Sequence, residues 1–237
     1  MEGPDGVSAA LSSGAKLREV FVTTAAAVDL AALLQAVRTS GARVIQVTDP
    51  VMAALSQTQA PQGLVATCAW SPAPLTASMR TGSSSVVLEG IADPGNAGTI
   101  IRTADAAGLG GVVLTEGSVD PGNGKCVRAS AGSLFHLPVS AGVRTEAALT
   151  RAHELGQSVV VATADGEHEV FAWARSHRPP QGLCWVLGNE AHGVTDRTRA
   201  AADASVRIPI KGRAESLNVA SAAAVCLYAA LAVGMED

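Results

Sequence analysis

Four short, uninterrupted runs of apolar residues limit most strongly what this chain can fold into. They lie at residues 85–88, 111–114, 158–162 and 183–187. A strand with one face in water alternates apolar and polar side chains, whereas a strand covered on both faces reads as a continuous apolar run. A helix is predicted between the first two runs, at residues 97–107. The pattern predicts an α/β domain in which a parallel sheet is covered by helices.

The first part of the chain is organised differently. Elements alternate along it, with helices predicted at 5–13, 28–40 and shortly after Asp49, and strands predicted at 17–23, 43–47 and 63–69. Such alternation predicts a small α/β layer domain. The next segment is rich in Pro, Ser and Thr and has no periodicity, which predicts a linker. We therefore expect a small domain at residues 1–70, a linker at 71–84 and a larger domain at 85–237.

Composition and charge exclude several classes of function. Apolar residues make up 48% of the 237 residues and charged residues 16%, which excludes a disordered tail protein. Aromatic residues make up only 3%, which argues against a single-strand binder built on stacked aromatic rings. The net charge of −4 gives no overall electrostatic footprint for nucleic acid. Any contact with nucleic acid must therefore come from local basic patches.

Three further patterns concern cofactors and location. The four cysteines are scattered without a Cys-x-x-Cys pair, which suggests neither a metal site nor a disulfide framework and favours a reducing cytoplasm. The longest apolar stretch, residues 219–233, is shorter than the ~20 residues that span a bilayer, so we expect a buried or interface helix rather than membrane insertion. A dinucleotide-dependent oxidoreductase is disfavoured, because the glycines at 108–111 follow a predicted helix and precede a strand.

The first segment that carries chemistry is residues 93–104, directly after a predicted strand. Asn96 is expected to cap the following helix, because its side chain can accept from the free amides at the helix start. Arg102 is the only basic residue of that helix, and a lone cation there is a candidate phosphate contact. The alternative is a capped helix with one surface arginine.

The second segment, residues 185–193, is a strand that runs into a polar loop flanked by glycines. Gly188 allows a ligand or another backbone to approach closely, and Asn189 and Glu190 place polar groups at the carboxyl end of a parallel strand. Ligands of open α/β sheets bind at that end. The alternative is an ordinary turn, and His192 has no identified partner that would make it a catalytic base.

The third segment, residues 205–221, combines a short apolar strand, a basic loop and a helix start. Its cations, Arg207, Lys211 and Arg213, could meet a phosphate backbone even on an acidic protein. Ser216 is expected to cap the helix that runs to Val233. The alternative is a solvated loop with a standard helix cap.

Together, in this order and spacing, the three segments resemble motifs 1, 2 and 3 of the SpoU/TrmH branch of the knotted methyltransferase superfamily. The resemblance rests on residues 93–104, on Leu187-Gly-Asn-Glu190 and on residues 208–220, and it covers roughly residues 85–233. More loosely, the first domain resembles the L30e-like RNA substrate-binding domain of rRNA-directed members. The resemblance implies a trefoil-knotted parallel-sheet methyltransferase domain preceded by a small L30e-like α/β domain.

The resemblance also implies the roles of individual residues and the assembly. Bent S-adenosylmethionine would be held by the backbone and side chains around Leu187, Gly188, Ile208, Ile210, Leu217 and Asn218. Arg102 would be the catalytic residue, in a site completed by Asn96, Glu190, Ser216 and Asn218. RNA would be contacted by Arg128, Arg207, Lys211 and Arg213. Members of the family are homodimers with sites at the interface, so Arg102 is expected to face the partner's cofactor pocket.

The activity implied is transfer of a methyl group from S-adenosylmethionine to a ribose 2′-hydroxyl of RNA, in 23S rRNA rather than tRNA, without a metal. A guanidinium group stays protonated in proteins, so Arg102 is expected to hold a phosphate and polarise the hydroxyl. Two alternatives stay open, a tRNA-directed enzyme and an inactive RNA-binding module of the same fold. The sequence departs from the family where Glu2-Gly-Pro-Asp5 directly follows Met1, which predicts a truncated first domain, and where Ala191-His192 follows motif 2.

Overall fold

The structure is a computed structural model that describes residues 1–237 except 57, 178, 180 and 234–237. The first domain is a mixed three-stranded sheet in the order β2-β1-β3, in which β1 runs parallel to β2 and antiparallel to β3. Its strands are β1 (Lys16–Thr23), β2 (Arg43–Val47) and β3 (Leu64–Ala69). Its helices are α1 (Pro4–Ser12), α2 (Thr24–Asp29), α3 (Ala31–Thr39) and α4 (Asp49–Leu55).

One helix of this domain differs from the expectation. The single helix predicted at 28–40 is replaced by α2 and α3, which meet at Leu30. Thr23 caps α2 by accepting a hydrogen bond from the amide of Ala26 at 3.3 Å, so helical structure begins directly after β1. The prediction missed this start because the alanines at 25–27 carry no amphipathic pattern.

The expected linker is partly packed against the second domain. It contains the short helix α5 (Leu75–Ser78), whose Ser78 hydroxyl lies 2.6 Å from that of Ser140. The next residue, Met79, is fully buried under the larger sheet. A second contact joins the two domains, because a Cβ at Gly132 would lie only 2.3 Å from that of Ala9 in α1. The domains are therefore held against each other by more than the connecting chain.

The second domain contains the parallel sheet that the apolar runs predict. All of its strand pairs are parallel, in the order β6-β5-β4-β9-β7-β10-β8. The strands are β4 (Ser85–Glu89), β5 (Gly111–Thr115), β6 (Val139–Val143), β7 (Ser158–Ala162), β8 (His168–Glu169), β9 (Leu183–Gly188) and β10 (Ala204–Arg207). The four predicted apolar runs are β4, β5, β7 and β9, which form the centre of the sheet.

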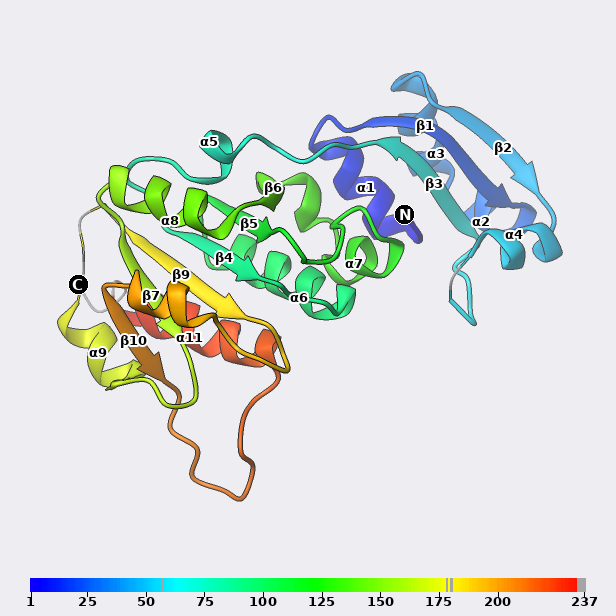
Figure 1. The fold of residues 1–237 in the computed structure, drawn as a ribbon. Helices are drawn as coiled ribbons and strands as arrows, with labels where there is room; N and C mark the ends of the chain where they lie inside the picture. Colours follow the sequence, from blue (N-terminus) through cyan, green and yellow to red (C-terminus); the bar gives the residue numbers. More distant parts are fainter. Residues whose placement is uncertain (57, 178, 180, 234–237) are drawn as a thin grey trace.

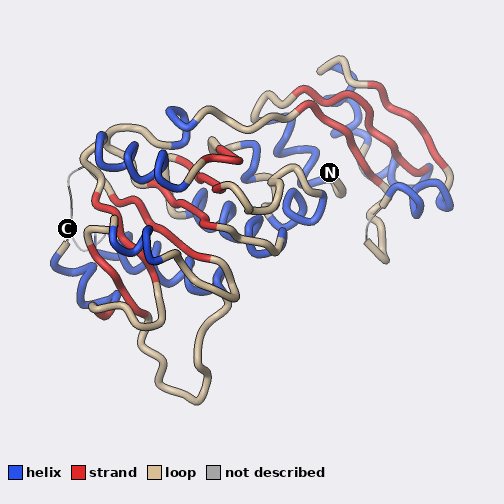
Figure 2. The backbone as a smooth tube through the Cα atoms, in the orientation of Figure 1, coloured by secondary structure: helices blue, strands red, loops and turns tan. Residues whose placement is uncertain are grey.

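Helices cover both faces of this sheet (Figures 1 and 2). One face is covered by α6 (Pro94–Ala106), α7 (Gly124–Ala129), the 3-10 turn η1 (Ser133–Phe135), α9 (Val170–Ser176) and α11 (Val219–Val233). The other face is covered by α5, α8 (Thr145–Glu154) and the segment around α10 (Asp196–Ala200). Among the described helices, none combines the length and apolar character needed to cross a bilayer.

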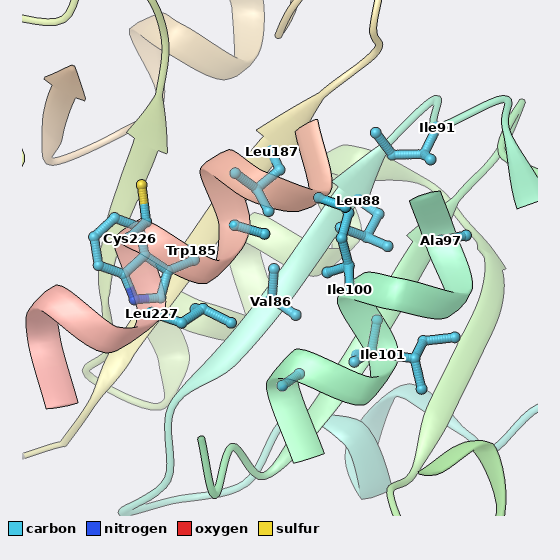
Figure 3. Close-up of a cluster of buried hydrophobic side chains, with 14 of the residues drawn as sticks. Val86, Leu88, Ile91, Ala97, Ile100, Ile101, Trp185, Leu187, Cys226 and Leu227 are labelled. Carbon is cyan, nitrogen blue, oxygen red and sulfur yellow. The ribbon is translucent and has the colours of Figure 1, made fainter. Parts of the chain in front are cut away.

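The central strand β4 shows why an uninterrupted apolar run was needed. Val86 and Leu88 point to the face covered by α6 and α11, while Val87 between them points to the face covered by α8. Figure 3 shows the first of these clusters, in which Leu227 of α11 lies beside Trp185 and Ile100 of α6 lies beside Val86 and Leu88. Every residue of β4 is buried as a result.

The strand order determines where polar groups can gather. β4 lies between β5, which follows it in the chain, and β9, which comes much later, so the chain direction across the sheet reverses here. Ligands of open parallel sheets bind outside the carboxyl ends of the strands at such a reversal. The residues after β10 leave this end as a long loop that extends away from the body before α11 begins (Figure 1).

Candidate functional site

A cavity of about 470 Å³ lies at the carboxyl ends of β7, β9 and β10 and is closed by the start of α11. All six residues expected to hold a cofactor line it, one of which, Asn218, is also an expected catalytic residue, and so do two further expected catalytic residues: Leu187, Gly188, Ile208, Ile210, Leu217, Asn218, Glu190 and Ser216. Ile210 and Leu217 are 37% and 40% exposed, so part of the apolar wall has no cover within the chain. Such a wall fits a planar apolar group.

A chain of hydrogen bonds joins the three motifs beside this cavity. Asn96 donates from Nδ2 to Oε1 of Glu190 at 2.9 Å, and Asn218 donates from Nδ2 to Oδ1 of Asn96 at 3.0 Å. The backbone amides of Ala92 and Asp93 also donate to the Glu190 carboxylate, at 3.3 and 3.4 Å. Residues far apart in the chain thus form one polar cluster, as expected for parts of a single site.

The surroundings of Glu190 favour its ionised form. Partial burial raises the pKa of this carboxyl, but hydrogen bonds from Asn96 and from the amides of Ala92 and Asp93 outweigh it and lower the pKa below 4.5. A carboxylate whose pKa is lowered is a weak base at neutral pH. Glu190 is therefore suited to orienting Asn96 rather than to removing a proton.

Both helix caps predicted at the site were assigned to the wrong residue. α6 begins at Pro94 and is capped by Asp93, which accepts from the amide of Asn96 at 2.9 Å, so Asn96 lies in the first turn. Asp followed by Pro is a common helix start, and this pattern was available in the sequence. α11 is capped by Asn218, which accepts from the amides of Ala220 and Ser221 at 2.9 and 3.4 Å.

Ser216 precedes that cap, in the exposed loop before α11. Because neither Asn96 nor Ser216 caps a helix, both side chains can face the cavity region. Asn218 has two functions, since its oxygen caps α11 while its nitrogen bonds to Asn96.

Arg102 is not brought to the cavity of its own chain. It lies on the exposed side of α6 and does not line the cavity. No residue that the structure describes forms a hydrogen bond or ion pair with its guanidinium group. The side chain is therefore available for a contact outside the chain.

The four expected RNA contacts fall into two groups. Lys211 and Arg213 are exposed on the protruding loop after β10. Arg207 is half-buried, and its Nη1 donates to the carbonyls of Gly166 and Glu167 at 2.7 and 2.8 Å.

Arg128 belongs with Arg207, because its Nη1 lies 3.2 Å from the Glu2 carboxylate of the first domain. The two more buried arginines thus contact their own chain, and of the four expected RNA contacts Lys211 and Arg213 are the exposed ones.

Sequence reasoning missed several residues at the site. Thr163 and Ala164 line the cavity directly after β7, and their place at the carboxyl end of a predicted parallel strand was a signal that could have identified them. Lys125 pairs with Asp93 at 2.6 Å, and this hydrogen bond lowers the pKa of the Asp93 carboxyl. No pattern in the sequence joins Lys125 to Asp93, which is 32 residues away.

Comparison with known proteins agrees with this geometry. Residues 83–228 match the SpoU rRNA Methylase family, and residues 1–66 match the MRM3-like substrate binding domain. The chain is 34% identical over 196 residues to the 23S rRNA (guanosine(2553)-2′-O)-methyltransferase RlmP of Bacillus subtilis, covering 80% of this chain and 73% of the relative. Other curated relatives are longer, and the chain spans 60% of one and 57% of another.

Solved structures also resemble the whole chain, and two of them serve as examples. The SpoU methyltransferase AviRb from Streptomyces viridochromogenes is 26% identical with a TM-score of 0.85, covering 100% of this chain and 89% of that one. An AdoMet-bound rRNA methyltransferase from Sinorhizobium meliloti is 31% identical with a TM-score of 0.84, covering 97% of this chain and 85% of that one. The family match over most of the chain, the full-length similarity and the meeting of the three motifs lead to one conclusion: this chain belongs to the SpoU rRNA methylase family.

Proposed function

We propose that the chain transfers a methyl group from S-adenosylmethionine to a ribose 2′-hydroxyl of RNA, and that the RNA is 23S rRNA. The observation that carries the proposal is the hydrogen-bonded chain Glu190–Asn96–Asn218 beside a cavity at the carboxyl ends of β7, β9 and β10. The Bacillus subtilis relative is named for 2′-O-methylation of 23S rRNA, and the Sinorhizobium meliloti structure contains AdoMet. The acidic chain would act in the cytoplasm, where ribosomes are made.

The cavity fits the cofactor in size and in chemistry. Its volume of about 470 Å³ lies within the ~300–1,000 Å³ of typical small-molecule sites. Ile208, Ile210 and Leu217 would cover the adenine ring, and the backbone at Leu187 and Gly188 would supply hydrogen bonds to the polar parts of the molecule. When bound, S-adenosylmethionine supplies a methyl group on a positively charged sulfur, which departs as a neutral thioether.

The chain's own residues would position the nucleophile. They would bring the ribose 2′-oxygen up to the methyl group that the cofactor supplies. Arg102 would grip the adjacent phosphate and polarise the 2′-oxygen, since a planar guanidinium can contact both. Asn96 and Asn218, held in place by Glu190, would fix the geometry together with Ser216.

The position of Arg102 supports a homodimer with sites shared between subunits. α6 and α11 pack side by side, and α11 is apolar around its whole circumference except at Ser221 and Tyr228. Tyr228 is 46% exposed, and an apolar helix with one side uncovered favours a protein partner. A second copy on this face would carry Arg102 to the partner's cavity and explain why it lies outside its own.

Mixing two impaired variants tests the shared site. In a dimer of Arg102→Ala with Asn218→Ala, one cavity keeps Asn218 and receives the intact Arg102 from the other subunit. We expect each variant alone to transfer methyl groups at least about 10-fold more slowly than the unmodified protein, and the mixture, after refolding together, to be clearly faster than either variant. No recovery, or a monomer by light scattering at micromolar concentration, would contradict the shared site.

We further propose that RNA is contacted by the loop that carries Lys211 and Arg213 and by the first domain, which matches a substrate binding domain at residues 1–66. Arg128 and Arg207 would contribute only if their contacts to Glu2 and to the 166–167 carbonyls opened. The resemblance along the whole chain also supports the trefoil knot, and the division at 70 and 85 into substrate-binding and methyltransferase domains.

The decisive experiment is mapping of 2′-O-methylation in 23S rRNA and in tRNA from a strain that lacks the gene. We expect the loss of one methylated nucleotide in 23S rRNA and its return with the purified protein and S-adenosylmethionine. Loss in tRNA alone would favour the tRNA-directed alternative. Calorimetry should show about one cofactor per subunit, unchanged by EDTA, and no cofactor binding would favour the inactive RNA-binding module.

A further inference from the structure

Glu89 is a buried carboxylate at the carboxyl end of the central strand β4, and it points away from the cofactor cavity. The side chain is among the buried residues, with 8% of its surface exposed. It accepts hydrogen bonds from the amide of Thr195 at 3.1 Å, from the Thr195 hydroxyl at 3.0 Å and from the Thr198 hydroxyl at 2.7 Å. All three donors belong to one short segment at the start of α10, so the carboxylate fixes that segment to the sheet.

The segment that Glu89 holds is the end of a loop that lines the cofactor cavity. Residues 189–194 lead from β9 to Thr195, and Gly193 donates to the carbonyl of Asn189 at 2.8 Å to close the loop. At its other end, Asn189 Nδ2 donates to the carbonyl of Gly90 at 2.7 Å. Glu89, the last residue of β4, and Gly90, which follows it, therefore hold the two ends of the 189–194 loop.

Packing supports only the ends of this loop. Val194 is buried in the core beneath α8 and the backbone of Gly193 lies against Gly188, whereas residues 190–192 are exposed. The cofactor cavity lies on one side of the loop, and a second cavity of about 820 Å³ lies on the other side, with Asn189 and Gly193 lining both. An exposed segment with few packed neighbours depends on its hydrogen bonds for a defined position.

We propose that Glu89 is a positioning residue for cofactor binding. By holding Thr195 and Thr198, it keeps the 189–194 loop against the cofactor cavity and keeps Glu190 within reach of Asn96. The inference rests on the proposed cofactor site. Glu89 itself contacts neither the cofactor cavity nor the RNA. Without these hydrogen bonds, the loop would spend part of its time in positions that do not form the cavity wall. The apparent affinity for S-adenosylmethionine would then fall in proportion to the fraction of molecules whose loop is in place.

The test uses Thr198, because it can lose its hydroxyl without changing shape. Thr198→Val removes one donor to a buried carboxylate and keeps the backbone cap of α10. Loss of a charge-assisted hydrogen bond that holds the loop should weaken S-adenosylmethionine binding about tenfold. Thr198→Ser keeps the hydroxyl and should bind within about twofold of the unmodified protein. At saturating cofactor the rate of methyl transfer should recover, because bound ligand restores the loop.

Ser85→Ala provides a matched control at the opposite end of the same strand. Ser85 is fully buried and donates to Oε1 of Gln157 at 3.2 Å, so the variant also loses a buried hydroxyl. It should lower stability to urea without changing cofactor affinity. Glu89→Gln, which leaves an amide facing the Thr195 amide, should weaken binding at least as much as Thr198→Val.

Three outcomes distinguish the possibilities, with folding of each variant checked by circular dichroism at the assay temperature. Weak S-adenosylmethionine binding by Thr198→Val, with normal binding by Ser85→Ala and Thr198→Ser, supports the positioning role of Glu89. Normal binding by Thr198→Val, or equal weakening by Ser85→Ala, overturns it. Failure of the unmodified protein to bind S-adenosylmethionine overturns the proposed function instead, so the two failures are distinguishable.

Discussion

Asn218 should show two separable effects, because its side chain uses one atom to stabilise α11 and another to build the site. Its oxygen caps α11 through the amides of Ala220 and Ser221, and its nitrogen donates to Asn96. Asn218→Asp keeps the capping oxygen and places a negative charge at the helix start, which the helix dipole favours. It loses the donor and puts a second carboxylate beside Asn96, which already bonds Glu190.

The magnitudes follow from these contacts. Asn218→Ala loses the cap and the hydrogen bond, so the free energy of unfolding should fall by about 1–2 kcal/mol. Asn218→Asp should stay within about 0.5 kcal/mol of the unmodified protein, because Asn and Asp cap about equally well. Methyl transfer should fall about 10- to 100-fold in both variants, since displacing Asn96 raises the barrier by roughly 1.4–2.8 kcal/mol.

The assays are urea unfolding for stability and single-turnover methyl transfer to an rRNA fragment for function, with cofactor affinity measured by calorimetry. Ser216→Ala is the control for the cap. Because Ser216 lies before the helix, this substitution should leave stability unchanged. Normal turnover by Asn218→Asp would refute the role of the Asn96 contact. Equal loss of stability in Asn218→Asp and Asn218→Ala would refute the assignment of the cap.

Four further results are expected. Arg102→Ala should leave cofactor affinity, measured by calorimetry, nearly unchanged and lower single-turnover methyl transfer by roughly 10²-fold or more. Arg102→Lys should rescue little of the lost rate. Loss of cofactor binding would show a different role for Arg102. The double change Lys211→Ala and Arg213→Ala should weaken RNA binding and reduce its salt dependence, with a slope change of about 1 to 2 in a plot against log salt. Gly188→Ala should cost at least about 3 kcal/mol of stability, because a Cβ there would lie 2.0 Å from the backbone of Gly193. The pKa of Glu190 is lowered from 4.5, so its stabilisation is present above that pH and is lost as pH falls through the lower folded value. Glu190→Gln should therefore lower stability to urea at pH 7, and the difference from the unmodified protein should shrink as the pH is lowered below 4.5.

The sequence was most informative where burial alone determines structure. The continuous apolar runs identified β4, β5, β7 and β9, because only strands covered on both faces tolerate such runs. β6 was not predicted, since Ser140 and Gly142 interrupt its apolar pattern and it lies at the edge of the sheet. Helix ends were less predictable, because Asp, Asn and Ser are all good caps and the sequence offers several of them in a row.

The candidate site could be predicted only through the family resemblance. The resemblance to SpoU methyltransferases is confirmed by the comparisons, and the residues that it names for the cofactor line one cavity. The roles of individual residues stay predictions. The partners of Arg207 and Arg128 were not predictable, because an arginine bonded to carbonyls or to a distant carboxylate reads in sequence like any exposed cation. The same holds for Glu89, whose donors lie 106 and 109 residues away.

The hydrogen-bonded chain at the site also has a consequence for folding kinetics. Its two links join residues separated by 94 and 122 positions in sequence, and contacts of such separation slow folding because loop closure costs entropy before they form. We therefore expect the binding site to form after the folding transition state, in the completed domain. A ligand that binds only there should slow unfolding in proportion to its occupancy and leave the refolding rate unchanged. S-adenosylmethionine would thus prolong the lifetime of the folded enzyme without helping it to form.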